Sequence, residues 1–380
     1  MSIKLAESPG TFVTLQNLGN TCFLNAIIQC LDSICELKYS IFIDTQTSKK
    51  AKRKLMKCLK QNSTKHDYEL GHLIVQTLNV MRMHSDRCIL QPTDLVRVLR
   101  KYQIQHLGYN QLEIFRQQDA HECINLLLDA IHNTISESTV NASVMSRADP
   151  ESFYDVVGHD LAGEWVKYIN CHGDSGIVRS FFGQTATVVE CQSCTSRSWK
   201  YQPSWTVHLP IPTTEGPGHS VDIKDCFRKF MEVEIMDGEN MYQCDKCNRK
   251  VIAKKKEVIG TPPNVLIIHL KRFHNCGAVK NNTLVTFPVS KTLDLTNEVL
   301  IANNALANYD EEFGETVHYR LNGVINHFGT LHAGHYTASC RKNNTSAWFY
   351  YDDQVMKYIP QPDKQIVIPA AYILFYTRIV

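Results

Sequence analysis

The sequence predicts an α+β fold in which a mainly helical N-terminal third is followed by a mainly strand-forming C-terminal half. Apolar residues recur at helical spacing in three early segments, residues 22–37, 69–83 and 119–135. From about Phe181 onward, short β-branched and aromatic runs are bounded by Pro, Gly and Asn, as in residues 265–270 and 371–377. Helices followed by an antiparallel-looking set of strands favour two parts that face each other across a cleft.

Several polar stretches interrupt these elements. Residues 48–66 are rich in Lys and also carry Ser, Thr, Asn and Gln, which favours a solvated insertion over a binding patch. Residues 136–174 and 299–315 are largely polar with poor periodicity, and we expect surface excursions there. Residues 254–256 are all Lys and are expected to form the solvated face of a strand. The sequence shows no repeat with a period of about 20 to 50 residues.

Size and composition indicate a folded protein without a general affinity for polyanions. The chain has 380 residues, which allows either two domains or one domain with large insertions. Hydrophobic residues make up 43% and charged residues 21%, so a substantial core can be buried. The net charge is only +2, which removes the general electrostatic argument for a nucleic-acid-binding or membrane-surface protein.

The first thirty residues contain no basic stretch followed by an uninterrupted apolar run, so no signal peptide is expected. No window approaches the roughly 18 to 20 apolar residues that a membrane-spanning helix needs. Fourteen cysteines without a secretory signal fit a reducing compartment, where thiols serve in packing, metal binding or catalysis. We therefore expect a protein of the cytosol or nucleus.

Cys22 follows a turn-forming Gly-Asn-Thr and opens a helical segment. Unpaired backbone N–H groups and the positive end of the helix dipole favour a thiolate at that position, and a neighbouring imidazolium would favour it further. Free cysteine is nevertheless among the most buried residue types, so a structural role is the better interpretation of Cys22 taken alone.

A histidine and a pair of carboxylates lie far downstream, where His335 and the pair Asp352 and Asp353 fall on adjacent predicted strands. In a Cys–His pair the imidazole takes the thiol proton and later protonates the leaving amine, while a carboxylate fixes its tautomer. The chain has sixteen histidines, so a single one would more often be structural. The combination with Cys22 is what indicates a thiol hydrolase.

Two CxxC pairs, Cys191 with Cys194 and Cys244 with Cys247, have the spacing of a structural Zn²⁺ site. The pairs are separated by 49 residues, 195–243, which is longer than the roughly 15 to 20 of a compact zinc ribbon. Four unmetallated thiols are the alternative. A closed shell of four cysteines would leave no open position for a catalytic water. The nine remaining cysteines, after Cys22 and these four, receive no functional assignment.

The chain resembles the ubiquitin-specific protease family of cysteine deubiquitinating enzymes through five motifs in the right order. These are residues 15–25 (LQNLGNTCFLN), 117–122 (QQDAHE), 263–273 (PNVLIIHLKRF), 319–353, which contains GHY at 334–336 and ends with YDD at 351–353, and 371–376 (AYILFY). The resemblance covers nearly the whole chain and leaves little room for further domains.

The resemblance implies a papain-like cysteine protease fold with a thumb, a palm and zinc-tipped β fingers. It implies one catalytic domain over residues 1–380, with a helical thumb at about 11–175, fingers at about 181–260 and a palm at about 261–380. The family's fingers cradle the globular part of ubiquitin, and their zinc is structural. It implies Zn²⁺ on Cys191, Cys194, Cys244 and Cys247, and no catalytic cofactor.

Matched residue by residue, the resemblance implies that Cys22 is the nucleophile, His335 the general base and acid, and Asp352 its orienting partner. Asp353 is a further catalytic candidate; adjacent carboxylates alternate faces on a strand, so only one of Asp352 and Asp353 should point at His335, and the other could hold a water or a loop. Asn17 matches the position that helps to bind the oxyanion, and its alternative role is to cap the turn.

Four further residues match positions along the family's channel for the ubiquitin tail, which ends in Gly-Gly and carries arginines. Gln117 and Asp119 come from the second motif, and an acidic Asp119 could accept an arginine of the tail. Its alternative role is to cap the following helix, and Asp119 may combine both. His327 and Tyr336 would border the glycine channel or simply belong to the core.

The implied activity is hydrolysis of the isopeptide or peptide bond after the C-terminal glycine of ubiquitin, through a thioester. Three alternatives stay open: the same chemistry on a ubiquitin-like modifier, a binding module that has lost activity, and a zinc-ribbon nucleic-acid binder. The last predicts a basic face and leaves the cysteine and histidine motifs unexplained. An activating protein partner is also open, since loops such as residues 275–282 and 328–333 could have to move before the triad aligns.

Overall fold

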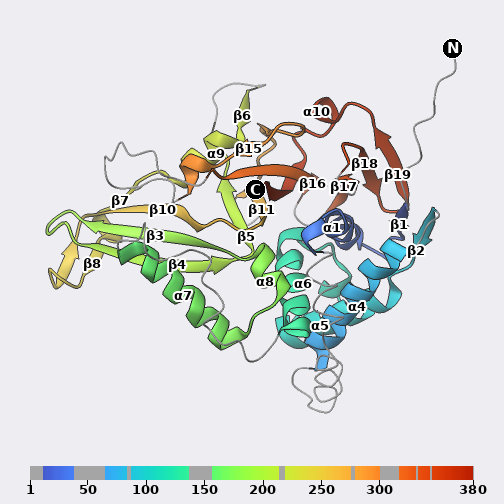
Figure 1. The fold of residues 1–380 in the computed structure, drawn as a ribbon, viewed down its shortest axis with the longest axis horizontal. Helices are drawn as coiled ribbons and strands as arrows, with labels where there is room; N and C mark the ends of the chain where they lie inside the picture. Colours follow the sequence, from blue (N-terminus) through green and yellow to red (C-terminus); the bar gives the residue numbers. More distant parts are fainter. Residues whose placement is uncertain are drawn as a thin grey trace. The chain divides into compact units, whose positions relative to one another are not determined.

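The computed structural model describes residues 12–37, 65–83, 87–136, 156–213, 219–274, 279–299, 316–330, 333–342 and 345–379 (Figure 1). The described residues form two compact units. The first unit takes its residues from Met1–Ile135 and Asn322–Gln361, and the second from Ser136–Leu321 and Pro362–Val380. Each unit combines helices with sheet, so the predicted α+β class is confirmed.

The helices of the first unit are α1 (Cys22–Asp32), α4 (Lys65–Met83), α5 (Thr93–Leu107), α6 (Ala120–Ile135) and the short 3₁₀ helix η1 (Glu113–Phe115). Residues Cys22 to Leu31 of α1 are all buried, as expected of a helix that is enclosed by protein on every side. Helix α4 packs closely on α6, because a Cβ atom at Gly71 would lie 2.1 Å from the carbonyl oxygen of Ala130. Only glycine allows this approach of the two backbones.

The strands of the first unit form a small parallel pair and an antiparallel sheet. Strand β1 (Val13–Leu15) pairs in parallel with β2 (Cys88–Leu90). Strand β16 (His318–Gly329) begins in the second unit and continues into the first, where it is followed by β17 (Gly334–Arg341), β18 (Trp348–Asp352) and β19 (Val355–Ile359). Each is antiparallel to the next. Helix α1 packs against β17 and β18, which places the start of α1 near the histidine strand.

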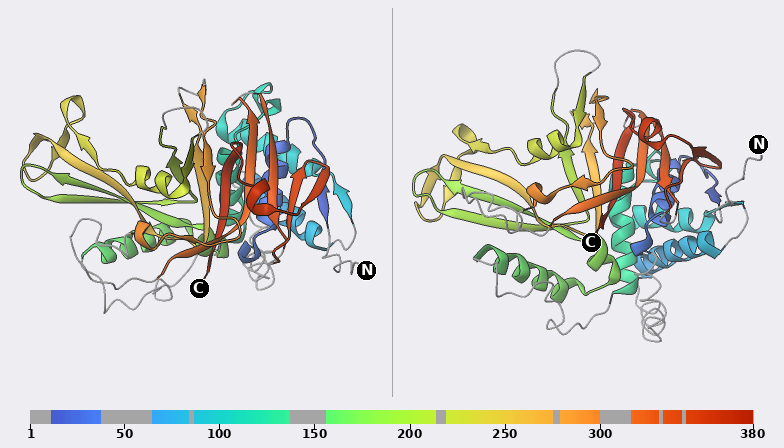
Figure 2. Two further views of the ribbon diagram at one scale, coloured as in Figure 1. Left: turned by 90° about the horizontal axis from the view of Figure 1, so that it is seen from above. Right: turned by 45° about the horizontal axis from the view of Figure 1, so that its top comes forward.

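The second unit contains a four-stranded sheet in the order β4-β3-β10-β7. Its strands are β3 (Gly183–Cys191), β4 (Arg197–Ser204), β7 (Glu234–Met236) and β10 (Ala253–Thr261). The hairpin of β8 (Tyr242–Cys244) and β9 (Arg249–Val251) lies at one end of these long strands, as the two views of Figure 2 also show. Lys254, Lys255 and Lys256 lie on β10, so the predicted strand is confirmed there.

The remaining sheet of the second unit is deeply buried. Strand β11 (Val265–Lys271) pairs in parallel with β5 (Thr206–Pro210) and antiparallel with β20 (Ala371–Ile379). Arg272, directly after β11, is 0% exposed and donates to the carbonyl oxygens of Ala371, Asn281 and Thr283. This buried arginine joins the end of β11 to the start of β20 and to the backbone at Asn281 and Thr283.

Smaller elements complete the second unit. Its helices are α7 (Val156–His172), α8 (Gly176–Phe181), α9 (Ile223–Phe230) and α10 (Pro362–Gln365), with 3₁₀ turns η3 (Gly238–Asn240) and η4 (Thr296–Glu298). Its short strands are β6 (Ser220–Asp222), β12 (Phe273–His274), β13 (Val279–Lys280), β14 (Leu284–Thr286) and β15 (Leu293–Asp294). None of the described helices combines the length and the apolar sequence needed to cross a membrane.

The three predicted helices are confirmed; the first runs as α1 to Asp32, and residues 35–37, the last of this described segment, are helical again. The predicted surface excursion over residues 136–174 contains a helix, α7, in its second half, and the described side chains of that helix are mostly exposed or half-buried. Trp165 and Tyr168 anchor this helix on Phe182, a contact that periodicity does not reveal. The predicted insertion at residues 48–66 lies largely outside the described residues, as does most of the stretch at 299–315.

Candidate functional site

The turn before Cys22 is organised by the side chain of Asn17. Its Oδ1 atom accepts hydrogen bonds from the backbone N–H groups of Gly19 at 3.1 Å and Thr21 at 3.2 Å. Gly19 and Asn20 adopt positive φ angles of 87° and 53°, the region that glycine and asparagine tolerate best. The turn therefore ends with the chain entering α1 at Cys22.

Cys22 is the first residue of α1 and is only 3% exposed. The Nε2 atom of Gln117 lies 3.7 Å from its Sγ atom. Burial raises the pKa of the Cys22 thiol above its ordinary value and the charge of Asp353 adds to this, whereas a backbone hydrogen bond from Tyr336 lowers the pKa. Because the net shift is upward, the thiol is protonated at neutral pH and needs a base to become a nucleophile.

His335 and Asp352, the predicted base and its orienting partner, are joined by a hydrogen bond. The Nε2 atom of His335, on β17, lies 2.7 Å from Oδ1 of Asp352 at the end of β18, and both side chains are 40% exposed. The bond to Nε2 leaves Nδ1 as the second ring nitrogen, the one available to a thiol. Within the described residues, no hydrogen bond joins His335 to Cys22.

Asp353 links three segments of the first unit, and one of its carboxylate oxygens lies within 4.8 Å of a ring nitrogen of His335. Its Oδ2 atom accepts from Nδ2 of Asn17 at 2.9 Å, and its Oδ1 atom accepts from Nδ2 of Asn25 at 2.8 Å. Its backbone carbonyl accepts from the N–H group of Leu15 at 3.3 Å. Asp353 thus ties the end of β18 to the cysteine turn and to α1.

Gln117 and Asp119 lie just before α6 and make separate contacts. Gln117 accepts a hydrogen bond from the backbone N–H of Gly334 through Oε1, while its Nε2 atom faces Cys22. It therefore connects the nucleophile to the residue before His335. Asp119 accepts from the N–H of His121 at 2.7 Å, so it caps α6.

His327 and Tyr336 are paired across β16 and β17, and their ring centroids lie 4.6 Å apart. The two residues are 0% and 1% exposed, so neither presents a surface to a ligand in this structure. The Tyr336 hydroxyl accepts from the N–H of Ala120 at 3.4 Å. A Cβ atom at Gly334 would lie 2.5 Å from Nε2 of His327, so this position requires glycine.

One residue of the site had no role in the sequence-based prediction, namely Asn25. It is 3% exposed on a helix whose other buried residues are mostly apolar, and it binds Asp353. A buried amide on an apolar helix requires a partner, because leaving it unpaired costs free energy. A polar residue within an otherwise apolar helical pattern is the sequence signal that could have identified Asn25.

The second unit brings the two CxxC pairs together. The Sγ atoms of Cys191, Cys194, Cys244 and Cys247 all lie within 4.8 Å of one another. Two Sγ–Sγ distances, Cys191 to Cys247 and Cys194 to Cys244, are both 3.8 Å. Four thiolates at Zn–S distances of about 2.3 Å in a tetrahedron would be about 3.8 Å apart, so the four sulfurs fit a tetrahedral metal ion.

The two pairs have matching local geometry, which also fits a metal. Backbone N–H groups of Ser193 and Cys194 point at the sulfur of Cys191, and that of Cys247 points at the sulfur of Cys244. A hydrogen bond with Ser196 lowers the pKa of Cys194 to about 6. This favours the thiolate at Cys194, the form that binds a metal, whereas the hydrogen bond with Cys194 raises the pKa of Cys247. The described structure thus contains a four-cysteine group able to hold a metal ion.

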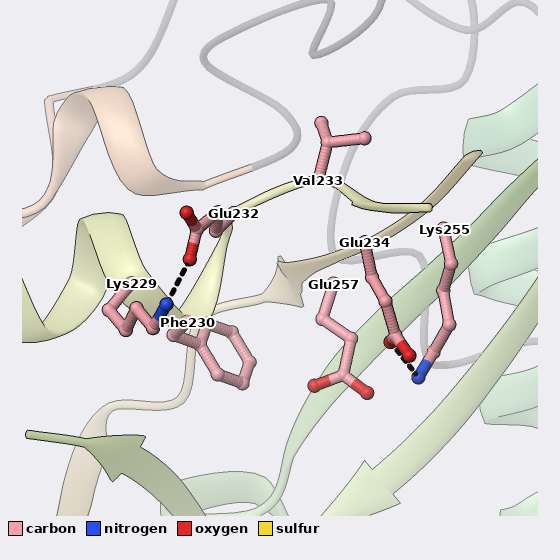
Figure 3. A pocket seen from close by; sticks show the side chains of 7 residues that line it. All are labelled: Lys229, Phe230, Glu232, Val233, Glu234, Lys255 and Glu257. Carbon is pink, nitrogen blue, oxygen red and sulfur yellow. Dashed lines mark hydrogen bonds and ion pairs between the residues drawn. The ribbon is translucent and has the colours of Figure 1, made fainter. Parts of the chain in front are cut away.

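The second unit also has a surface pocket of about 310 Å³, whose lining includes neither the catalytic candidates nor the four cysteines (Figure 3). Figure 3 shows that its two lysines are paired with glutamates, Lys229 with Glu232 and Lys255 with Glu234. Its lining contains no cysteine or histidine. Because the lysines are neutralised locally and no nucleophile is present, this pocket is not a candidate catalytic site.

Comparison with known proteins identifies the family. The family model described as ubiquitin carboxyl-terminal hydrolase matches residues 13–376. The human protein named ubiquitin carboxyl-terminal hydrolase 2 is 31% identical over 367 residues, which cover 95% of this chain and 54% of that protein. The bovine protein named ubiquitin carboxyl-terminal hydrolase 21 is 29% identical over 385 residues, covering 96% and 61%. The chain therefore spans only about half to three fifths of the length of these relatives.

Solved structures support the same fold. A structure of the yeast SAGA DUBm with an Sgf73 mutant has a TM-score of 0.65 at 21% identity, covering 97% of this chain and 69% of that chain. The SAGA Ubp8/Sgf11/Sus1/Sgf73 DUB module bound to ubiquitin aldehyde gives the same TM-score and identity, covering 97% and 70%. The predicted papain-like α+β fold agrees with these matches. Since the family model spans nearly all of the chain, the protein belongs to the ubiquitin carboxyl-terminal hydrolase family, as its motifs predicted.

Proposed function

We propose that the chain hydrolyses the bond after the C-terminal glycine of ubiquitin, in isopeptide or peptide linkage, by a Cys-His-Asp thiol mechanism. The observation that carries this proposal is the His335–Asp352 hydrogen bond of 2.7 Å, formed on a strand against which the cysteine-bearing helix α1 packs. Family membership supports the choice of ubiquitin as the modifier.

In the first half of the reaction, Nδ1 of His335 takes the proton of Cys22, and Sγ attacks the carbonyl carbon of the terminal glycine. The C–N bond then breaks as His335 returns the proton to the leaving amine, which leaves a thioester. A water molecule, deprotonated by His335, hydrolyses the thioester and restores the thiol. The 2.7 Å bond from Asp352 supports its role of fixing the His335 tautomer and stabilising the imidazolium.

We assign to Asn17 the role of a hydrogen-bond donor to the developing oxyanion. Its Oδ1 atom accepts from two backbone N–H groups, so the amide orientation is determined and Nδ2 must be the donor atom. One hydrogen of Nδ2 goes to Asp353, and the other is left for the oxyanion. Asp353 is then a positioning residue, since it acts through Asn17 and not on the substrate.

The ubiquitin tail would enter along Gln117, Asp119, His327 and Tyr336. Gln117 bonds Gly334 and faces Cys22, and the rings of His327 and Tyr336 are buried. A tail passing these residues must therefore displace Gln117 and open the turn before Gly334. Asp119 offers a carboxylate for an arginine of the tail in addition to its helix-capping bond.

The four-cysteine group is assigned to structural Zn²⁺ at the tip of the fingers. Its Sγ–Sγ distances of 3.8 Å and the N–H groups directed at Cys191 and Cys244 support a tetrahedral site. A closed shell of four thiolates would supply folding free energy and no Lewis-acid chemistry. The proposed layout keeps one catalytic domain, with a thumb at 11–175, fingers at 181–260 and a palm at 261–380.

Two further assignments follow from the same observations. A reducing compartment, cytosol or nucleus, is supported by the free thiol state of all described cysteines. An activating protein partner is favoured by the raised pKa of Cys22 and by the missing bond to His335 in the described residues. The Ubp8 structure is that of a module with other subunits, which is compatible with this view.

The test is reaction of the full chain with ubiquitin that carries a C-terminal electrophile. We expect a covalent adduct with the native chain and none with Cys22→Ala, because only the thiolate of Cys22 attacks the electrophile. The matched control is Cys171→Ala, which removes an exposed thiol of α7 and should leave the adduct unchanged.

An adduct that survives Cys22→Ala would contradict the assignment of the nucleophile. An adduct formed with a ubiquitin-like probe but not with ubiquitin would move the same chemistry to another modifier. Absence of reaction with every probe, including in the presence of added partner proteins, would make the chain a binding module.

A further inference from the structure

A groove of about 530 Å³ runs along one face of α5 in the first unit, and we call it the α5 groove. It is lined by a helical stripe of α5 that includes Val96, Arg100 and Ile104, and by Phe115 of η1. Leu18, four residues before Cys22, also lines it. Most of the surface that it presents is apolar.

Exposed apolar side chains are concentrated in and beside this groove. Ile104 is 39% exposed and Phe115 is 55% exposed, and both line it. Leu107, the last residue of α5, is 49% exposed, and Leu112, directly before η1, is 75% exposed. Single exposed apolar residues are ordinary, whereas a contiguous group is typical of an interaction surface.

The rim of the α5 groove is basic. Arg97, Arg100 and Lys101 all line it. Arg97 pairs with the exposed Asp94 at 2.9 Å, but neither Arg100 nor Lys101 has an acidic partner among the described residues. The pocket of Figure 3 is the opposite case, because each of its lysines is neutralised by a neighbouring glutamate. The α5 groove therefore keeps uncompensated positive charge beside apolar surface.

The groove is held in shape by contacts with the cysteine turn. The guanidinium of Arg100 lies 4.5 Å from the ring centroid of Phe115 and donates to the carbonyl oxygens of Leu18 at 3.3 Å and Gly19 at 3.0 Å. Asn20 donates to the carbonyl of Phe115 at 2.8 Å. A groove that is built before binding requires less ordering on association, which favours affinity.

We propose that the α5 groove binds an acidic, amphipathic segment of a partner protein. Apolar side chains of that segment fill the space between Ile104 and Phe115, and its carboxylates pair with Lys101 and Arg97 at the rim. The proposal goes beyond the hydrolase activity and does not depend on it. Because the groove shares Leu18 and Arg100 contacts with the cysteine turn, the bound partner lies beside the segment that carries Cys22.

The positive charge of the rim favours an acidic segment as the occupant. An acidic segment gains favourable pairing with Lys101, which has no acidic partner among the described residues, and can share Arg97 with Asp94, whereas a basic segment meets like charge along the rim. The stripe along α5 spans three helical turns, from Thr93 to Ile104, so a helix laid in the groove can meet it with its own apolar face. A second copy of this chain is the competing occupant, and the experiment separates the two.

The experiment measures binding of labelled synthetic helical peptides to the full chain by fluorescence anisotropy. The first peptide has Leu and Phe at helical spacing and Glu elsewhere. The second has Lys in place of Glu, and the third has Ala in place of Leu and Phe. We expect the first to bind about tenfold or more tightly than either of the others, with affinity that falls as salt is raised.

Variants locate the binding. Arg97→Glu combined with Lys101→Glu should weaken the first peptide about tenfold, and Ile104→Asp should do the same. The matched control reverses two exposed lysines elsewhere, Lys200→Glu with Lys357→Glu, and should change binding less than about twofold.

Three results would overturn the proposal. The first is a Glu peptide that binds no more tightly than the Lys or Ala peptide. The second is equal loss of binding in the Lys200 and Lys357 control. The third is a dimer of the native chain in sedimentation that Ile104→Asp dissociates, since the occupant would then be a second copy.

Discussion

The two candidate sites are assembled in different ways. The four-cysteine group of the second unit is made of two short segments, each with its own turn, in which Thr195 and Asn248 have positive φ angles of 57° and 51°. The catalytic candidates of the first unit come from distant segments, and the Asn17–Asp353 hydrogen bond joins residues 336 positions apart. Local spacing thus determines the arrangement of the sulfurs within each CxxC pair, whereas the geometry of the catalytic candidates depends on how helices and strands pack.

This difference predicts different responses to mutation. A site whose ligands are all required should fail completely when one is removed. A site held by several separate hydrogen bonds should lose function gradually, according to which bond is removed. The following changes test the comparison in order of decreasing effect.

Removal of one sulfur from the four-cysteine group should have the largest effect. We expect Cys244→Ser to abolish stoichiometric Zn²⁺ binding, because structural zinc sites contribute about 10–16 kcal/mol only when all four ligands are present. The measurement is metal content together with hydrogen exchange of β3, β8, β9 and β10. Exchange there should accelerate, while α1 and β17 keep their protection.

The control is Cys171→Ser, which removes an exposed thiol in the same unit. It should retain both metal and protection. If Cys244→Ser kept one bound zinc per chain, the four sulfurs would not be a metal site. If hydrogen exchange accelerated equally in the first unit, the conclusion that the four-cysteine group is held locally would be wrong.

We expect an effect of intermediate size for Asp353→Asn. The substitution keeps the shape of the side chain and removes the charge that accepts from Asn17 and Asn25. Asn keeps one acceptor oxygen, so one of the two bonds is lost; a hydrogen bond to a charged group contributes about 1.5–3 kcal/mol, and we expect the free energy of unfolding to fall by about that amount. We also expect kcat to fall about tenfold to hundredfold, with KM little changed, because Asn17 acts on the transition state.

The matched change is Asp352→Asn, next to it on the chain. That substitution removes the partner of His335, so it should alter the pH dependence of kcat without the same loss of stability. A normal kcat in Asp353→Asn would remove the positioning role. An equal change of pH profile in both variants would mean that the two carboxylates do not act separately.

Much of the fold and of the site was accessible from the sequence, for identifiable reasons. Strong periodicity gave α1, α4 and α6, and the spacing of the CxxC pairs gave the cysteines that come together. Helix α7 was missed because its anchor is a tertiary contact of Trp165 and Tyr168 with Phe182. No local pattern encodes such a contact.

The catalytic candidates show the same limit. The motifs identified Cys22, His335 and Asp352, but they did not reveal that Asn25 binds Asp353 or that Gln117 connects Cys22 to Gly334. The burial of His327 and Tyr336 fits the core alternative that the sequence left open for them. These features depend on the packing of α1 and β17, which lie far apart in the sequence.

The smallest effect concerns the protonation of Cys22. Burial raises the pKa of this thiol in the folded chain above the ordinary value of 9.0. The neutral thiol therefore stabilises the fold at pH below the ordinary value, and this stabilisation is lost as pH rises through the raised pKa. In a His335→Ala background, alkylation of Cys22 by iodoacetamide should rise with pH and have its midpoint above 9.0, since only the thiolate reacts.

The same titration with His335 present sharpens the contrast between the sites. If the midpoint stays above 9.0, the imidazole does not ionise the thiol in the resting chain, and alignment must accompany binding of substrate or partner. A midpoint near neutrality would mean that the two residues already form an ion pair in solution. That result would contradict the resting state described for Cys22, and the catalytic site would then be as fully assembled in the free chain as the four-cysteine group.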